Sequence, residues 1–299
     1  MQHLLTVEGL SKAYERFHLE DISFSLPPGY IMGFIGRNGA GKTVTIKSVL
    51  NLVRPDSGRV TIFGQDYAEH EVELKRAIGV ALGPVEFYPT TRLAKLTDVF
   101  RRFYPAWDDG VYRSYLKRFE LDETKTVKEL STGMKVKYAL ALALSHDAKL
   151  LILDEPTTGL DPVSRDDLLD LFREFIEPGD RSILFSTQLV SDLEACADFI
   201  TYIRDGRLVA SADRDEFLGS YVLVKGPKDQ LQGPLEPALI GYKPTDLGFT
   251  GLIQAADAGL AADCQTSTPT IEQVMVYSER RAGTGPDNGY PSQAGVLVR

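Results

Sequence analysis

The residues Gly36 to Thr43 carry the clearest chemistry in the chain, because they fit the phosphate-binding pattern G-x-x-x-x-G-K-[ST]. Glycines let the backbone approach a phosphate closely, so that backbone N–H groups point at the anion. In this pattern Lys42 reaches the β- and γ-phosphates of a nucleoside triphosphate, and the Thr43 hydroxyl binds Mg²⁺. The predicted phosphate-binding residues are Gly36, Arg37, Asn38, Gly39, Ala40, Gly41, Lys42, Thr43 and Val44.

A strand and a helix must position this loop. The apolar run from Tyr30 to Ile35 predicts a buried strand before it, and residues 44–52 predict a helix after it. Because a helix N-terminus favours negative charge, the order strand, glycine loop and helix indicates an anion site. The alternative is a chance glycine turn, which these flanking elements disfavour.

Two carboxylates, Asp154 and Glu155, follow the apolar run Leu150–Leu153. In nucleotide hydrolases, a strand that ends in this way places one carboxylate at Mg²⁺ and the next near the attacking water. Asp154 is therefore predicted to hold the metal, usually through water, and Glu155 to orient and polarise the nucleophilic water. Acidic strand ends are common and mostly structural, so this prediction depends on the glycine loop.

A third motif, Leu130-Ser131-Thr132-Gly133-Met134, precedes an expected helix over residues 135–145. Taken in chain order, the glycine loop, this motif, the acidic strand end and the run Gly159-Leu160-Asp161 resemble an ABC-type ATPase subunit. The resemblance covers about residues 4–215. It implies ATP and Mg²⁺ as cofactors and ATP hydrolysis as the activity.

The third motif departs from the family's L-S-G-G-Q signature, since Thr132 replaces the first Gly and Met134 replaces Gln. Ser131 and Gly133 remain. The resemblance implies that these two residues present a hydroxyl and a helix N-terminus to the γ-phosphate bound by the other subunit of a head-to-tail dimer. The same residues also predict an N-capped amphipathic helix, and the two interpretations are compatible.

Two further residues are assigned by the resemblance. Tyr14 matches the aromatic residue that stacks on adenine, although a lone Tyr near an N-terminal strand is more often part of a core. Asp161 matches the family's D-loop. It is equally a candidate N-cap, with Pro162 as the first helical residue.

Two positions differ from the family in ways that bear on catalysis. Gly83 stands where the family usually has a Gln that contacts Mg²⁺ and water. Glu86 is near in sequence, but the pattern does not show that it replaces this Gln. Gln188 stands where the family has a His that grips the γ-phosphate. A Gln amide donates hydrogen bonds but carries no charge. We expect a subunit that binds ATP well and hydrolyses it slowly as a homodimer.

The fold class follows from alternating elements. Near-continuously apolar strands that alternate with helices after residue 150 indicate an α/β fold with a mainly parallel sheet. As a P-loop NTPase of ABC type, the chain is expected to have an ATPase domain over residues 1–218, with an N-terminal antiparallel β-subdomain and a helical subdomain over about 87–148. A small accessory domain over 219–281, with β-like runs at 222–224 and 272–277, and a flexible tail over 282–299 complete the prediction.

Composition limits the partners. The net charge of -9 argues against nucleic acid, because a basic face is its usual footprint. Two isolated cysteines, Cys196 and Cys264, indicate a reduced compartment. With no signal peptide and no apolar run long enough to span a bilayer, we expect a cytoplasmic protein at the inner face of the membrane. A membrane-spanning permease and a second ATPase, identical or not, are the partners that the resemblance implies.

Short strings also resemble the bacterial YtrB-type subunits of exporters linked to cell-envelope stress and peptide antibiotics. These strings are residues 103–108, 182–187 and 270–277. Aromatic residues over 87–119, among them Tyr104 and Trp107, form either a socket for the permease or the core of the helical subdomain. The alternative functions are an ATP-gated regulatory or resistance protein with little turnover, and a soluble ABC protein that acts on DNA or ribosomes.

Overall fold

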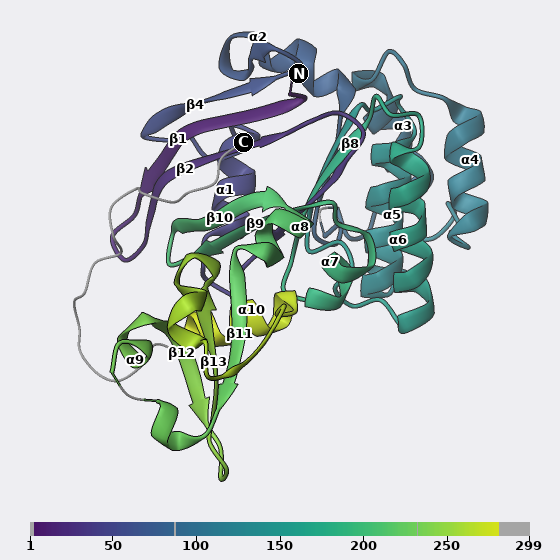
Figure 1. The fold of residues 1–299 in the computed structure, drawn as a ribbon. Coiled ribbons are helices and arrows are strands. Elements are labelled where there is room, and N and C mark those ends of the chain that lie inside the picture. The colour runs from purple at the N-terminus through teal and green to yellow at the C-terminus, as the bar shows by residue number, and fades with distance from the viewer. Residues whose placement is uncertain (1–2, 87, 232, 281–299) are drawn as a thin grey trace. The chain divides into compact units, whose positions relative to one another are not determined.

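The computed structural model describes residues 3–86, 88–231 and 233–280, in two compact units divided between Val209 and Ala210 (Figure 1). Both units combine sheets and helices, and the first confirms the expected α/β fold with parallel strands. The predicted tail at 282–299 lies outside the described residues. The predicted domain limits remain predictions.

A six-stranded sheet in the order β10-β9-β3-β8-β7-β6 forms the centre of the first unit. Neighbouring strands from β9 to β6 run parallel. All residues of β3, β7 and β8 are buried, and β3 and β7 are almost entirely apolar in sequence. The polar residues of β8 are buried with hydrogen bonds from their hydroxyls; they are Ser182, Ser186 and Thr187. The strands are β3 (Ile31–Ile35), β6 (Ile78–Leu82), β7 (Leu150–Asp154), β8 (Ser182–Thr187), β9 (Phe199–Arg204) and β10 (Arg207–Asp213).

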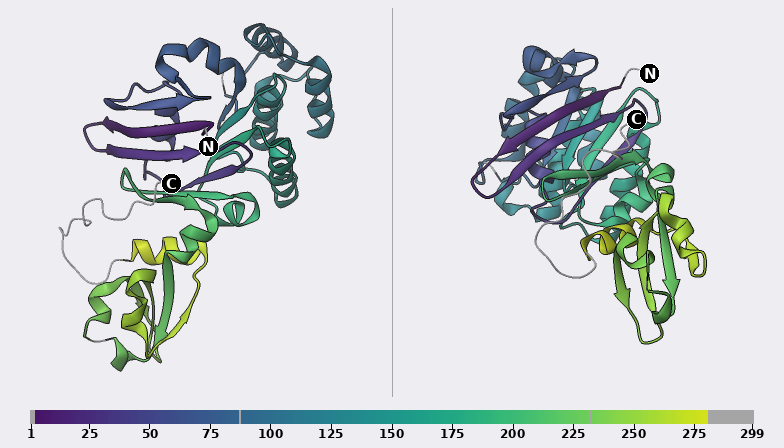
Figure 2. Two further views of the ribbon diagram at one scale, coloured as in Figure 1. Left: turned by 45° about the horizontal axis from the view of Figure 1, so that its top comes forward. Right: turned by 60° about the vertical axis from the view of Figure 1, so that its left-hand side comes forward.

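A second, antiparallel sheet has the order β2-β1-β4-β5, and its long strands lie side by side in Figure 2. Helix α1 (Lys42–Val49) contacts β1 and β2 of this sheet and β7 of the other. Phe24, Phe34 and Ile46 belong to the core that these elements share. The helix that follows the glycine loop is therefore fixed by two sheets. The remaining elements of this region are β1 (Leu5–Ala13), β2 (His18–Leu26), β4 (Ser57–Ile62), β5 (Gln65–Asp66), α2 (Tyr67–Leu74) and η1 (Lys75–Ala77).

Helices dominate residues 93–144, as the sequence predicts (Figure 1). Helix α5 is mostly buried, and it contacts β6 and α4. Its Tyr138 shares a buried hydrogen-bond group with Thr97 and Tyr112, at 3.0 and 2.7 Å from the Thr97 hydroxyl. These helices are α3 (Leu93–Phe100), η2 (Arg101–Phe103), α4 (Asp109–Arg118), η3 (Val127–Glu129) and α5 (Thr132–Leu144). Helices α6 (Pro162–Ile176) and α7 (Val190–Cys196) cover β8 and β3.

The second unit contains an antiparallel sheet in the order β12-β13-β11-β14. Leu239, Phe249 and Ile253 are among the residues of its core. Helix α10 packs against β12 and β13, as Figure 2 shows in yellow. The elements are α8 (Arg214–Gly219), β11 (Tyr221–Gly226), η4 (Lys228–Gln230), α9 (Leu235–Ala238), β12 (Leu239–Pro244), β13 (Phe249–Gln254), η5 (Ala255–Ala261), β14 (Gln265–Ser267) and α10 (Ile271–Glu279).

The expected β-like run at 272–277 is wrong, because these residues lie in α10. Thr270 caps the helix: its hydroxyl accepts from the Gln273 N–H at 3.2 Å, while Gln273 accepts from the Thr270 N–H at 2.9 Å. Ile271, Val274 and Ser278 form the buried face. This spacing of three and four residues is helical, so the cap and the buried stripe outweigh the local strand propensity.

Across the described parts of the chain, none of the helices combines the length and the apolar character that a membrane span requires.

Candidate nucleotide-binding site

The glycine loop connects β3 to α1, as the sequence predicts. Gly36 lies so close to the neighbouring backbone that a Cβ atom would stand 2.4 Å from the carbonyl oxygen of Ile203. Gly41 has a φ of 116°, a conformation that residues with a Cβ rarely adopt. Both positions therefore require glycine, and the loop leads directly into the N-terminus of α1.

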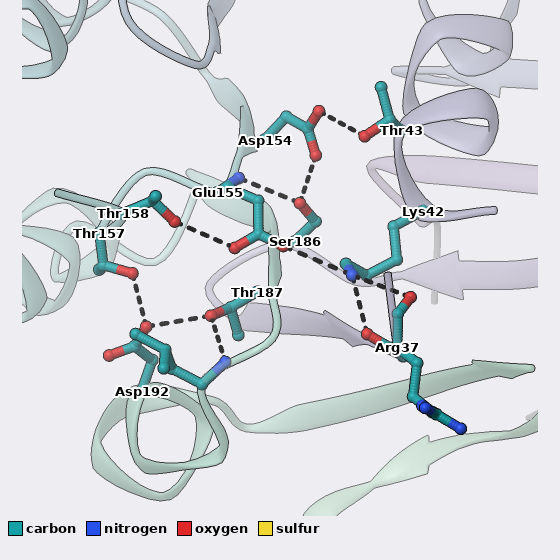
Figure 3. Close-up of polar contacts among 12 residues, drawn as sticks. Arg37, Lys42, Thr43, Asp154, Glu155, Thr157, Thr158, Ser186, Thr187 and Asp192 are labelled. Carbon is teal, nitrogen blue, oxygen red and sulfur yellow. Dashed lines mark hydrogen bonds and ion pairs between the residues drawn. The ribbon is translucent and has the colours of Figure 1, made fainter. Parts of the chain in front are cut away.

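Lys42 is held at the centre of the loop and is only 5% exposed. Its ammonium donates to the carbonyl oxygens of Gly36 and Arg37 at 2.8 and 3.4 Å. It also pairs with the Glu155 carboxylate at 3.4 Å. Figure 3 shows these contacts converging on the lysine nitrogen. The sequence predicted that Lys42 and Glu155 share a site, and the structure brings their side chains together.

The carboxylate of Asp154 connects the loop to the sheet. One oxygen accepts from the Thr43 hydroxyl at 2.8 Å, and the other accepts from the Ser186 hydroxyl at 2.5 Å. Thr43 and Asp154, the two predicted metal ligands, are thus adjacent (Figure 3). Hydroxyl and carboxylate oxygens suit Mg²⁺, which usually takes few protein ligands and completes its shell with phosphates and water. The residues present therefore fit this metal.

Ser186 was not among the predicted site residues. It is the register partner of Asp154 in the neighbouring strand β8, and its hydroxyl also accepts from the Glu155 N–H at 3.1 Å. The Glu155 N–H bonds the Ser186 carbonyl oxygen at the same distance. Glu155 itself has a φ of 51°, which is unusual for a residue with a Cβ. One serine therefore orients both acidic residues, and local backbone strain is stored beside the site.

A pocket of about 740 Å³ opens over the loop. It brings together most of the predicted phosphate-binding residues with Tyr14, Glu155 and Gln188. Arg16, Phe17 and Thr158 also line it and were not predicted; Thr158 donates to the Glu155 carboxylate at 3.2 Å. The lining residues are Tyr14, Arg16, Phe17, Arg37, Asn38, Gly39, Gly41, Lys42, Thr43, Val44, Glu155, Thr158 and Gln188.

Tyr14 lies in the turn between β1 and β2, where its N–H donates to the Phe17 carbonyl oxygen at 2.8 Å. Its side chain is 42% exposed and faces the pocket rather than the core. Phe17 approaches Gly41, since a Cβ there would stand 2.9 Å from the Phe17 ring. The turn therefore packs on the glycine loop, and the Tyr14 ring lines the pocket with the Lys12 ammonium 5.9 Å from its centroid.

The two positions that depart from the family differ in placement. Gln188 follows β8, is exposed and lines the pocket. Gly83 follows β6 and has a φ of 76°, with nothing within 4 Å of where a Cβ would be. Glu86 is exposed and is absent from the described residues that line the pocket. The backbone at Gly83, rather than lack of space, is what favours glycine.

The signature residues lie apart from this pocket. Ser131 is exposed at the start of α5, where its hydroxyl accepts from the Met134 N–H at 3.2 Å. Gly133 packs against the Gly159–Leu160 turn. Asp161 caps α6 through bonds from the N–H groups of residues 163 and 164, and the Ser164 N–H in particular holds the pKa of Asp161 below its ordinary value. None of these residues lines the described pocket.

Comparisons with known proteins find ATP-binding proteins of ABC transporters. The ABC transporter family model matches residues 19–158. The ABC transporter ATP-binding protein YtrB of Bacillus subtilis is 32% identical over 74% of this chain and 76% of its own length. The daunorubicin resistance ATP-binding protein DrrA3 of Streptomyces coeruleorubidus is 31% identical over 91% of this chain and 95% of its own. A solved ATP-binding subunit of an ABC transporter superimposes with a TM-score of 0.65 at 29% identity, covering 71% of this chain and 91% of that one.

Proposed function

Because the chain belongs to the ABC transporter ATP-binding protein family, we propose that it hydrolyses ATP to power export through a membrane-spanning permease. The observation that carries this proposal is the convergence of Lys42, Glu155 and Gln188 on one pocket. The Streptomyces relative is named for daunorubicin resistance, which outward transport would provide. We assign the protein to the inner face of the membrane, where the permease would hold it.

In the proposed site, the loop and Lys42 bind the β- and γ-phosphates, and the ring of Tyr14 stacks on adenine. Thr43 and Asp154 would hold Mg²⁺, whose charge would offset that of the phosphates. Glu155 orients and polarises the attacking water. Its carboxylate accepts from Thr158 and its N–H donates to Ser186, so the ion pair with Lys42 is the contact that the γ-phosphate would have to replace.

The proposed turnover is slow. The family's Gln and His are replaced by Gly83 and Gln188, and the Gln188 side chain makes no hydrogen bond to any described residue. A lost transition-state contact costs about 10²–10³ in rate, although a Gln still donates to a phosphate. The same observation favours a second function, in which the protein acts as an ATP-gated regulator by binding alone.

We propose that the working form is an ATP-clamped dimer. Ser131 and Gly133 lie at the exposed start of α5 and outside the pocket, so they are available to the phosphates bound by a second subunit. Asp161 lies near Gly133 through the turn at residues 159–160 and joins the same surface in this proposal. The second subunit is either identical or a sister ATPase.

The permease socket is proposed at the exposed aromatics of the helical region. Tyr88 and Phe103 are 68% and 70% exposed. Tyr104, by contrast, stacks on His146 at 3.8 Å and on Phe100 at 4.7 Å, and Trp107 contacts Phe100. The stacked residues serve the core, so Phe103→Ala should reduce co-purification with the permease while Tyr104→Ala should instead lower stability.

The experiment that tests the proposed function measures ATP affinity and steady-state turnover side by side, with and without the permease. Turnover that is lost in Glu155→Gln and stimulated by the permease supports a transport ATPase. The regulator is favoured if ATP binds tightly but Glu155→Gln leaves turnover unchanged, both with and without the permease.

A further inference from the structure

Asp192 is a fully buried carboxylate that the proposed catalytic machinery does not include. One oxygen accepts from the hydroxyls of Thr157 at 2.7 Å and Thr187 at 3.1 Å. The other accepts from the guanidinium of Arg165, with which it forms an ion pair. A buried charge is costly unless it is paired and hydrogen-bonded, and the Asp192 carboxylate has both an ion pair and hydrogen bonds.

The partners of Asp192 come from the segments that carry the proposed site. Thr157 lies two residues after Glu155, within the turn that Thr158 closes on the Glu155 carboxylate. Thr187 immediately precedes Gln188, and its hydroxyl also accepts from the Leu189 N–H at 2.9 Å. Figure 3 shows Asp192 between Thr157 and Thr187. One carboxylate thus connects the Glu155 turn to the Gln188 segment.

The third partner extends the connection to Asp161. Arg165 belongs to the first turns of α6, and its N–H bonds the Asp161 carbonyl oxygen at 2.9 Å. Its guanidinium also donates to the Ser191 hydroxyl. The Arg165 side chain is 26% exposed and therefore reaches water, whereas the Asp192 side chain is fully buried. The buried hydroxyl bonds are therefore the more rigid part of the network.

We propose that Asp192 is a positioning residue, which fixes Glu155 relative to Gln188 without touching the nucleotide. Asp192, Thr157 and Thr187 are absent from the described residues that line the pocket, so ATP affinity should not depend on them. The rate of catalysis should depend on these three residues, because a misplacement of about 1 Å in a reacting group costs roughly 10²-fold in rate. This inference rests on the proposed ATP hydrolysis.

The test uses Thr157→Val, which removes one hydroxyl at nearly constant volume, together with Asp192→Asn, which keeps the shape but removes the charge. We expect kcat to fall by about 10- to 100-fold in each, with the Kd for ATP within about twofold of wild type. Arg118→Ala breaks a surface ion pair with Glu174 elsewhere in the same unit and serves as the control, with unchanged kcat.

Thermal melting separates misfolding from misplacement, and Thr157→Val keeps the test valid if Asp192→Asn does not fold. A folded Thr157→Val protein with wild-type kcat would overturn the role of Asp192, as would a Kd that rises in step with the loss of kcat. If wild-type turnover is itself independent of Glu155, both this role and the proposed hydrolysis fail. Turnover that needs Glu155 but not Thr157 refutes only the positioning role.

Discussion

In the binding half of the candidate site, which comprises residues 36–43 and Asp154, the lysine is buried and both oxygens of the aspartate are hydrogen-bonded. In the proposed hydrolytic half, Glu155 and Gln188 line the pocket but Gly83 does not, and only Glu155 has its side chain fixed by described partners. The first half is organised before any ligand arrives. The second half relies on one carboxylate, so binding and hydrolysis should respond very differently to substitution.

The largest effect should come from Glu155→Gln, because it removes the one fixed group of the hydrolytic half. We expect kcat to fall by about 10²–10⁴-fold with ATP still bound. Phosphate release and nucleotide titration measure the two quantities. Glu86→Gln is the matched control. A comparable loss of kcat in Glu86→Gln would mean that Glu86 replaces the family's missing Gln. The hydrolytic half would then not rely on Glu155 alone.

Lys42→Ala should weaken ATP binding by about 10- to 100-fold, since a charge-assisted hydrogen bond contributes roughly 1.5–3 kcal/mol. Calorimetric titration of the purified protein gives the affinity directly. Lys47→Ala, at the last turn of the same helix, should leave it unchanged. If the Lys42 variant bound ATP as tightly as wild type, the binding half would not be organised around this residue.

Gln188→His should raise kcat by about 10-fold in the homodimer, because a charged imidazole would supply a stronger contact to the γ-phosphate. The affinity for ATP should change little. The matched control is Gln65→His on the exposed strand β5. A turnover within about twofold of wild type would show that Gln188 does not limit the reaction.

The smallest effect should follow Gly83→Ala. The space around this position is open, so only the left-handed backbone opposes a Cβ, at a cost of about 1–2 kcal/mol in folding free energy. Chemical denaturation measures it. Gly219→Ala, which is equally open but has no left-handed φ, should not be destabilising. Equal stability of the two variants would show that the Gly83 backbone relaxes freely.

The sequence predicted the strand, loop and helix around residues 36–43, because this pattern is local. Three glycines, a lysine and a threonine within eight residues specify both the backbone path and its ligand. The fold class was also predictable, because runs of apolar residues that alternate with helices are a local pattern. The family pattern pointed to Tyr14 and Gln188, and the acidic strand end pointed to Glu155; the structure puts all three at one pocket.

The rest depends on contacts between distant residues. Ser186 reaches Asp154 only because β7 and β8 are neighbours in register, which no local pattern specifies. Asp192 meets Thr157 across 35 positions of the chain for a similar reason. At residues 272–277, however, a local signal was available, since Thr270 and Gln273 have the spacing of a capping box.

In the proposed site, the ion pair between Lys42 and Glu155 would help to discriminate between nucleotides. A ligand must compete with the protein's own carboxylate for the ammonium, and the strength of that internal competitor sets a threshold. A nucleoside monophosphate, which does not extend to Lys42, gains nothing from this competition. In the proposed mechanism, a triphosphate would draw the lysine away, and the Glu155 carboxylate, still held by Thr158, would then face the attacking water.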